Sequence, residues 1–132
     1  MPKIRVNFFI SGANVELENI TKELKIEPSN TRKKNDWPQG SINAGIAKDI
    51  WELQTEKEEC KSISWQFDKL QNLLQPKTEI INKLCDYYEL KTNITIVVEM
   101  EAGDGPEFVL SRGNVQFSAL INAEIGFDLY ID

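Results

Sequence analysis

Apolar and polar residues alternate along several stretches of the chain, and a period of two residues is typical of a β-strand with one buried face. The strand-like pattern is clearest in residues 4–10 and in residues 92–100. Shorter apolar patterns in residues 50–53 and 127–131 predict two more strands. The hydrophobic pattern therefore predicts at least four strands.

Four other stretches carry apolar residues at the three- and four-residue spacing of an amphipathic helix. These stretches are residues 17–24, 63–74, 80–88 and 115–121. Pro76 separates the second helix from the third, because proline interrupts the hydrogen bonding of a helix interior.

The predicted elements follow one another in the order β-α-β-α-α-β-α-β, which indicates an α+β protein. This order favours a ferredoxin-like or related fold, with a mainly antiparallel sheet of four to five strands and helices packed on one face. Each half contains a strand, a helix and a second strand, which indicates a weak internal repeat. Gly126 should supply the left-handed residue that ends the last helix. A chain of 132 residues with 41% apolar residues should form a single domain over 1–132.

Residues 29–48 show little periodicity and are rich in polar residues, glycine and charge, so they predict a long irregular loop. Long loops in compact domains often carry function, which makes Arg32, Asp36 and Trp37 candidate partner-binding residues. An aromatic residue in a polar loop either pins the loop to the domain or contacts a partner. The basic run that begins at Arg32 fits a solvated loop, a protein contact or, less well, a nucleic-acid patch.

The net charge of −6 is concentrated near the end of the sequence, where residues 101–132 hold six acidic residues and one basic residue. This distribution argues against nucleic acid as a partner, because nucleic-acid affinity depends on Lys and Arg. Acidic residues would suit a protein partner with a basic surface, or they serve solubility alone. The sequence has no signal-peptide pattern and no apolar run that would span a membrane, so we expect a cytoplasmic protein. Two cysteines without a pairing motif fit a reducing compartment.

The chain contains no histidine, which excludes Ser-His-Asp and Cys-His catalysis and histidine-ligated metals. We expect Cys60 to be a surface or boundary thiol and Cys85 to be a small core residue. The carboxylates of residues 99–107 surround a glycine turn but do not match a calcium-binding loop, so no metal and no cofactor is predicted. Trp51 and Trp65 should lie in the core.

Short segments in a particular order resemble a bacterial family known as domain of unknown function 4279. The residues that carry the resemblance are Phe8, Ile10, Gly12, Ile20-Thr21, Leu24, Ile26, Pro28-Ser29, Trp51, Leu53, Leu70, Leu73-Leu74, Pro76, Leu110-Ser111, Gly126, Asp128 and Tyr130. The resemblance implies an α+β fold and a bacterial intracellular protein, and it brings no catalytic residues with it. Many small acidic proteins of this class are immunity proteins that neutralise a toxin, which is an argument by analogy.

Three functional hypotheses follow from these observations. The preferred one is a small acidic protein-binding module, of which an immunity-type protein is one form, that is not an enzyme and binds through residues 29–48 and the acidic last third. The alternative is an enzyme or small-ligand domain that uses carboxylates such as Glu99, Glu101 or Asp128 in a cleft. A third is a self-associating protein, because sheets of this kind often leave an edge free for pairing.

Overall fold

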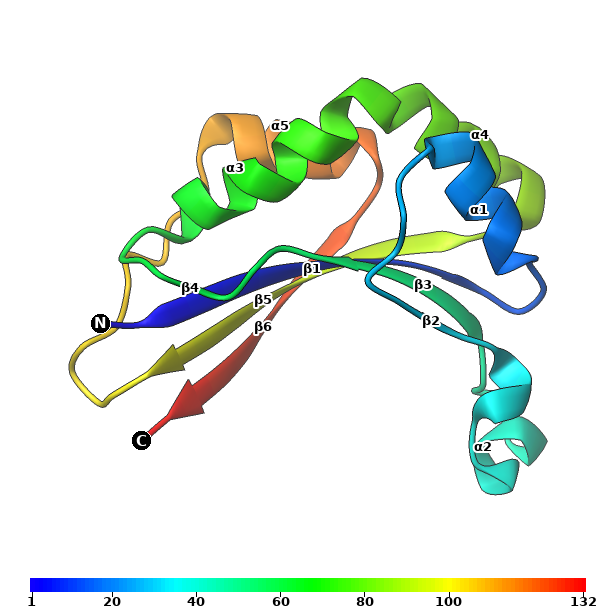
Figure 1. The fold of residues 1–132 in the computed structure, drawn as a ribbon, viewed down its shortest axis with the longest axis horizontal. Helices are drawn as coiled ribbons and strands as arrows, with labels where there is room; N and C mark the ends of the chain where they lie inside the picture. The colour runs from blue at the N-terminus through cyan, green and yellow to red at the C-terminus, as the bar shows by residue number, and fades with distance from the viewer.

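The computed structural model describes residues 1–132, which form one layer of helices on one face of a six-stranded sheet (Figure 1). The strands are β1 (Lys3–Gly12), β2 (Asn30–Arg32), β3 (Asp49–Gln54), β4 (Glu58–Glu59), β5 (Lys91–Met100) and β6 (Glu124–Ile131). The helices are α1 (Leu17–Leu24), α2 (Gln39–Asn43), α3 (Ile63–Leu74), α4 (Thr78–Tyr88) and α5 (Arg112–Leu120). The predicted α+β class is therefore confirmed, and each of the predicted strands and helices is present.

The sheet is mixed, so the prediction of a mainly antiparallel, ferredoxin-like sheet of four to five strands is only partly confirmed. Its strand order is β2-β3-β1-β5-β6, and β4 pairs with the beginning of β1. β1 pairs antiparallel with β3 and with β5, whereas β5 and β6 are parallel. The parallel pair is possible because α5 carries the chain back to the start of β5 before β6 begins.

The two halves of the chain do not repeat one another. In the first half β1 and β3 are antiparallel neighbours, because β2 runs in the direction of β1 and the chain reverses between β2 and β3. In the second half β5 and β6 are parallel neighbours with a single helix between them. The similar order of elements therefore arises from two different connections.

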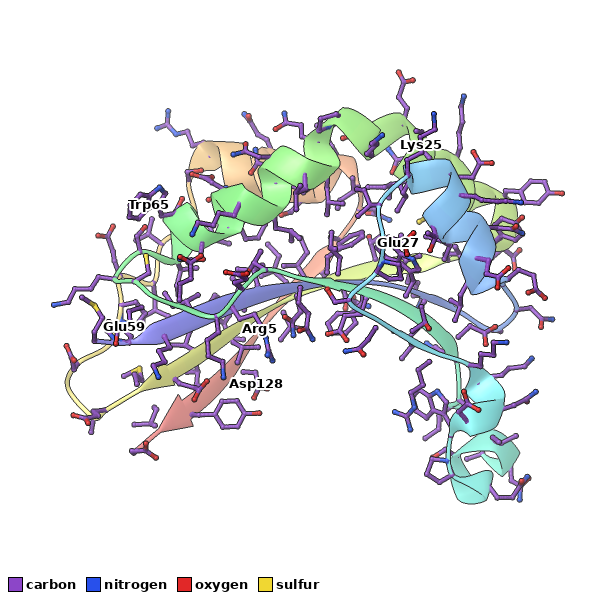
Figure 2. All side chains as sticks on the ribbon, in the orientation of Figure 1. Arg5, Lys25, Glu27, Glu59, Trp65 and Asp128 are labelled. Atoms are coloured by element: carbon purple, nitrogen blue, oxygen red, sulfur yellow. The ribbon has the colours of Figure 1, made fainter.

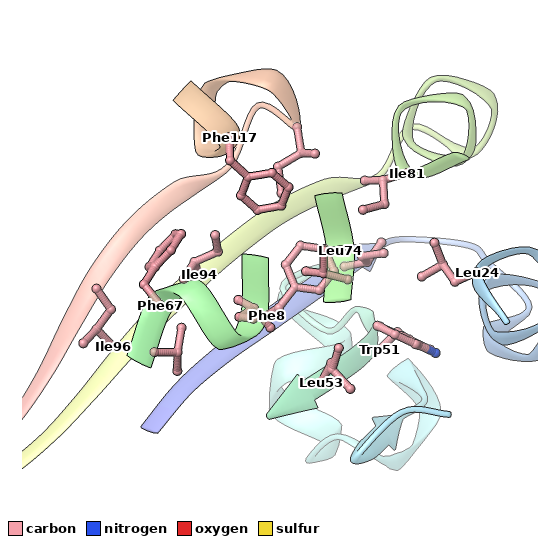
Figure 3. Packing of buried hydrophobic residues seen from close by; sticks show 14 of the residues in the cluster. Phe8, Leu24, Trp51, Leu53, Phe67, Leu74, Ile81, Ile94, Ile96 and Phe117 are labelled. Carbon is pink, nitrogen blue, oxygen red and sulfur yellow. The ribbon is translucent and has the colours of Figure 1, made fainter. Parts of the chain in front are cut away.

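The core fills the space between the sheet and helices α1, α3, α4 and α5 (Figures 1 and 3). Phe8 of β1 lies near its centre, and Phe117 of α5 and Leu74 of α3 cover it from the helical layer. Trp51 of β3 is fully buried, as predicted, and its indole N–H donates a 3.0 Å hydrogen bond to Thr21 Oγ1. None of the helices has both the length and the apolar character needed to cross a bilayer.

Trp65 does not lie in the core, which corrects the prediction from its helix. The buried stripe of α3 contains Ile63, Phe67, Leu70 and Leu74. Trp65 follows Ile63 by two positions, which turns its side chain roughly 200° around the helix axis, away from that stripe. Its side chain is 67% exposed and points away from the sheet (Figure 2).

Residues 29–48 are not an irregular loop. They contain β2, a 3₁₀ turn at Lys34–Asp36 and helix α2, and they extend beyond the sheet as an arm (Figure 1). The buried carboxylate of Asp49 holds the base of this arm, because it accepts hydrogen bonds from the N–H groups of Lys34 (2.9 Å) and Val15 (3.1 Å).

Helix α5 begins with a capping box made by Ser111 and Asn114. Its end differs from the prediction, because Asn122 and not Gly126 adopts the left-handed conformation, with φ 56°. Asparagine tolerates this conformation better than most residues, and the turn can therefore end before Gly126, which lies within β6.

The side chain of Asn114 joins the start of α5 to α3 and is completely buried. Its Oδ1 accepts hydrogen bonds from Ser111 N–H (3.0 Å) and Ser64 Oγ (2.6 Å). Its Nδ2 donates to Asp68 Oδ1 and Gln71 Oε1, both at 2.8 Å. The amide thus uses all four of its hydrogen-bonding positions.

We expect Asn114→Ala to lower the free energy of unfolding by about 2–3 kcal/mol, because it leaves several partly buried polar groups without a partner. Denaturant titration followed by circular dichroism measures this loss. Gln71→Ala removes one acceptor from a partly exposed site and should cost less than about 1 kcal/mol. Equal losses for the two variants would contradict the central role of Asn114.

Candidate functional site

The two edges of the sheet differ in length and protection. β2 forms one edge with only three residues, and the arm continues directly from it. β6 forms the other edge with eight residues and has β5 as its single neighbour (Figure 1). The register from Asn93↔Glu124 to Met100↔Ile131 is unbroken, so β6 contains no bulge.

The backbone of β6 offers unpaired hydrogen-bonding groups along its outer side. Asp132 N–H donates to Met100 O, and Asp132 O accepts from Ala102 N–H, so both backbone groups of Asp132 point toward the β5 side. Successive residues of a strand point their backbone groups to opposite sides. The N–H and C=O groups of Ile125, Phe127, Leu129 and Ile131 therefore point away from β5, toward solvent.

The side chains of the outward-pointing residues of β6 form an apolar row on the face of the sheet that carries the helices. They lie at the margin of that face, where no helix covers them. Phe127, Leu129 and Ile131 are each between 44% and 55% exposed. They lie beside Ile96, Val98 and Met100 of β5 in the register. The ring of Phe108, which is itself half exposed, lies 6.2 Å from the ring of Phe127 and extends this row toward α5. We call Phe108, Phe127, Leu129 and Ile131 the apolar row.

On the opposite face of β6 the exposed side chains form an acidic row, made of Glu124, Asp128 and Asp132. Tyr130 lies within this row and donates a 2.9 Å hydrogen bond to Asp128 Oδ2. This hydrogen bond to a carboxylate raises the pKa of the Tyr130 hydroxyl above its usual range. No Lys or Arg follows Arg112 in the sequence, so no positive side chain of β6 itself balances the row.

The open face of the sheet has a hollow of about 440 Å³ beside the acidic row. Arg5, Lys57 and Glu99 line it together with Tyr130 and Asp132, and Val97 forms part of its floor. Glu99 forms an ion pair with Lys57, and the hydrogen bond from Lys57 lowers the pKa of the Glu99 carboxyl group. Figure 2 shows Arg5 and Asp128 on this same side of the sheet.

A larger groove lies on the other side of the molecule, between α1 and α4. Its volume is about 820 Å³, and its walls include Ile80, Leu84 and the exposed ring of Tyr87. Half of its lining is polar or charged, namely Asn19, Glu23, Lys83 and Asp86, and Asn19 Nδ2 donates to the hydroxyl of Tyr88 at 3.3 Å. The groove therefore has a mixed lining in which apolar and charged side chains alternate.

The structure places the candidate binding residues Arg32, Asp36 and Trp37 at the β2 edge. The Arg32 guanidinium carbon lies 4.4 Å from the centre of the Trp37 ring, which is half buried, and Asp36 is exposed in the adjacent 3₁₀ turn. Three strands separate this edge from β6, a distance of roughly 19 Å at the usual strand spacing. The arm and the acidic last third therefore form two separate surfaces.

Of the carboxylates named for a cleft, Glu99 and Asp128 lie near one another on the open face of the sheet, whereas Glu101 does not join them. Glu99 lines the hollow on the open face, and Asp128 lies on β6 with its hydroxyl partner Tyr130. Glu101 is exposed beyond the end of β5. No group of three potential metal ligands occurs in the structure.

The sequence predicted β6 as a strand but did not identify it as an exposed edge of the sheet. Its alternation of apolar and acidic residues is typical of any half-buried strand. The edge position depends on the pairing of β6 with β5, which the local pattern does not contain.

The two cysteines are free, and their environments differ from the predictions. Cys60 is 7% exposed and belongs to the core, so it is not a boundary thiol. Cys85 is only partly buried and packs against the edge of the core. Burial, together with the negative charge of Asp86, raises the pKa of the Cys85 thiol from 9.0 to about 11.

We expect Cys85 to react slowly with iodoacetamide at pH 8, because a rise from 9.0 to about 11 leaves about 100-fold less thiolate. The rate should increase about tenfold per pH unit until the pKa is reached. Mass spectrometry of the alkylated peptides measures this rate, and the same reaction in denaturant is the control. Rapid native labelling at pH 7 would identify Cys85 as an activated thiol instead.

The comparisons with known proteins agree with the resemblance found in the sequence. The family model described as domain of unknown function (DUF4279) matches residues 2–132. No curated protein and no solved structure matches the chain. Since the family model spans essentially the whole chain, the protein belongs to the DUF4279 family.

Proposed function

We propose that the protein is a small acidic protein-binding module and that the β6 edge is its binding site. The observation that carries this proposal is an eight-residue edge strand whose apolar row and outward backbone groups both face solvent. An extended segment that pairs with such an edge gains main-chain hydrogen bonds and side-chain contacts together.

The different protection of the two edges supports this proposal. Proteins usually guard an edge strand by making it short, by placing charged residues or Pro in it, by a bulge, or by covering it. β2 is short and leads into a Lys-containing arm, so that edge is guarded. β6 is long and has no Lys, no Pro and no bulge, so its protection is the negative charge of the acidic row, which repels a second copy but not a basic segment. An edge in this state is suited to a partner.

The arm formed by residues 29–48 is a second contact surface in this proposal. Arg32 and Trp37 present a stacked pair there, and Asp36 adds a charge beside them. Because the arm lies at the opposite edge of the sheet, it would contact a different part of a large partner or a different partner.

An immunity-type role is the biological form of this proposal that we favour. In that role the module would bind a toxic protein in the bacterial cytoplasm and block its action, without being an enzyme itself. The net charge of −6 and two free cysteines are compatible with it.

A small-ligand or carboxylate-based catalytic function is the alternative. The hollow beside Glu99 supports it, because the Nε of Arg5 is buried there without a hydrogen-bond partner. The lowered pKa of Glu99 argues against a general acid at this position, since a general acid must hold its proton near neutral pH.

Site-specific photo-cross-linking tests the β6 edge in cells of the source organism. We expect a photoreactive amino acid at position 129 to form a cross-link with one partner protein. The same amino acid at position 73 is the matched control, because Leu73 of α3 is also apolar and half exposed but lies on the helical layer. Cross-links of similar yield at both positions, or none at position 129, would contradict the proposal.

Proline and alanine at position 129 separate the backbone contribution from the side-chain contribution. Leu129→Pro removes an outward-facing N–H and leaves the β5 ladder complete, whereas Leu129→Ala keeps this N–H. We expect Leu129→Pro to weaken binding of the cross-linked partner at least tenfold, and Leu129→Ala to weaken it less. Binding is measured by biolayer interferometry with the purified proteins.

The arm is tested by Trp37→Ala, which removes the stack with Arg32. We expect a loss of stability of about 1 kcal/mol and a larger loss of affinity for the partner. Tyr87→Ala is the control, because Tyr87 is an exposed aromatic residue on α4, outside the arm. If Trp37→Ala mainly lowers the unfolding temperature and leaves affinity unchanged, Trp37 only pins the arm.

A further inference from the structure

The chemistry of the two faces of β6 specifies which kind of segment would fit the edge. A strand that pairs with β6 presents alternate side chains to the apolar row and to the acidic row. Within β6, the apolar row consists of Phe127, Leu129 and Ile131, and the acidic row consists of Glu124, Asp128 and Asp132. The matching segment therefore alternates apolar residues with residues that complement carboxylates.

The carboxylates of the acidic row have no basic partner on the edge. Asp128 is hydrogen-bonded only to the hydroxyl of Tyr130, which does not neutralise its charge. The neighbouring carboxylate of Glu99 is already paired with Lys57. Arg5 of β1 lines the same hollow as Asp132 but forms no ion pair with the acidic row, and in the register Val97 of β5 stands between Arg5 and Asp128. An incoming strand with positive side chains would therefore balance the charge of the acidic row.

Gly126 adds a feature of shape to the acidic row. It lies between Glu124 and Asp128, and a Cβ added at this position would meet no atom within 4 Å. The row therefore has a gap between two carboxylates, where the long side chain of Lys or Arg can lie along the strand and reach both.

A second copy of the chain fits this edge poorly. A two-fold axis would pair β6 with itself in the antiparallel direction. Each register that keeps the apolar rows on one face places Asp128 directly opposite, or diagonal to, a carboxylate of the second copy. Like charges at these positions destabilise strand pairing, and each chain also carries a net charge of −6.

We infer that the β6 edge binds an extended segment of another protein in which apolar residues alternate with Lys or Arg. This inference rests on the proposed function and specifies the partner of the same site. The segment adds a seventh strand next to β6, bonds to the outward backbone groups of residues 125–131, and sets its basic side chains on the acidic row.

Three synthetic peptides of nine residues test the inference with the full-length protein. One alternates Val or Thr with Lys, the second replaces each Lys by Glu, and the third has the composition of the first with its Lys residues in one block. Each carries a fluorophore, an acetylated amino end and an amidated carboxyl end, and binding is measured by fluorescence anisotropy at 50 and 200 mM NaCl.

We expect the alternating Lys peptide to bind at least tenfold more tightly than either of the other two, and several-fold more weakly at 200 mM than at 50 mM salt. Leu129→Pro should reduce its affinity at least tenfold, and Leu129→Ala should reduce it less. The double variant Glu124→Lys with Asp128→Lys should reverse the preference toward the Glu peptide. Circular dichroism of each variant verifies that it remains folded.

Three results would overturn the inference. Equal binding of the Lys and Glu peptides would show that charge does not select the partner, and a cross-link at position 129 would still support a binding edge. A dimer in light scattering that Leu129→Pro dissociates, with no peptide binding, would assign the edge to a second copy. No peptide binding and no dimer would reject the basic strand, and the cross-linking result would then decide the proposed function separately.

Discussion

The antiparallel ladder between β1 and β5 is the interaction on which the rest of the domain depends. It pairs the first strand with a strand in the last third of the chain, from Lys3↔Glu99 to Ser11↔Lys91. Everything between these strands, including β3, α3 and α4, is closed into one large loop by this pairing. The ladder also presents the buried sides of both strands to the helical layer as one continuous surface.

The position of this ladder explains why the two sheet edges have different characters. β3 and β2 extend the sheet from β1, and the chain then leaves the β2 edge as an arm anchored by Asp49. On the other side, β6 extends the sheet beyond the area that the helices cover, so its apolar residues are left half exposed. The exposed β6 edge is thus a consequence of a sheet wider than its helical layer.

Local pattern was sufficient for most elements but not for their relations in space. The alternation in residues 4–10 and the helical spacing in residues 63–74 identified β1 and α3, because these periods depend on burial of one face. The parallel pairing of β5 and β6 could not be predicted, since it depends on contacts between distant residues. A short strand such as β2, with every residue exposed, has no hydrophobic signal at all.

Individual predictions were wrong where the type of a residue, or of its sequence neighbours, did not match the place of its side chain in the fold. Trp65 has the composition of a core residue, but its place on α3 turns it to solvent. Cys60 has charged neighbours in sequence, yet its own side chain is buried at the point where β4 leads into α3. For the candidate site, the acidic character and the apolar alternation of β6 were visible, whereas its unpaired backbone was not.

The acidic row on β6 has a second effect, which concerns the protein when no partner is bound. An uncovered apolar edge is a template for assembly of identical chains into larger aggregates. Repulsion between the carboxylates of Glu124, Asp128 and Asp132 on neighbouring copies opposes this assembly. One row of side chains therefore has two effects, since the charges that would attract a basic segment also keep identical chains apart.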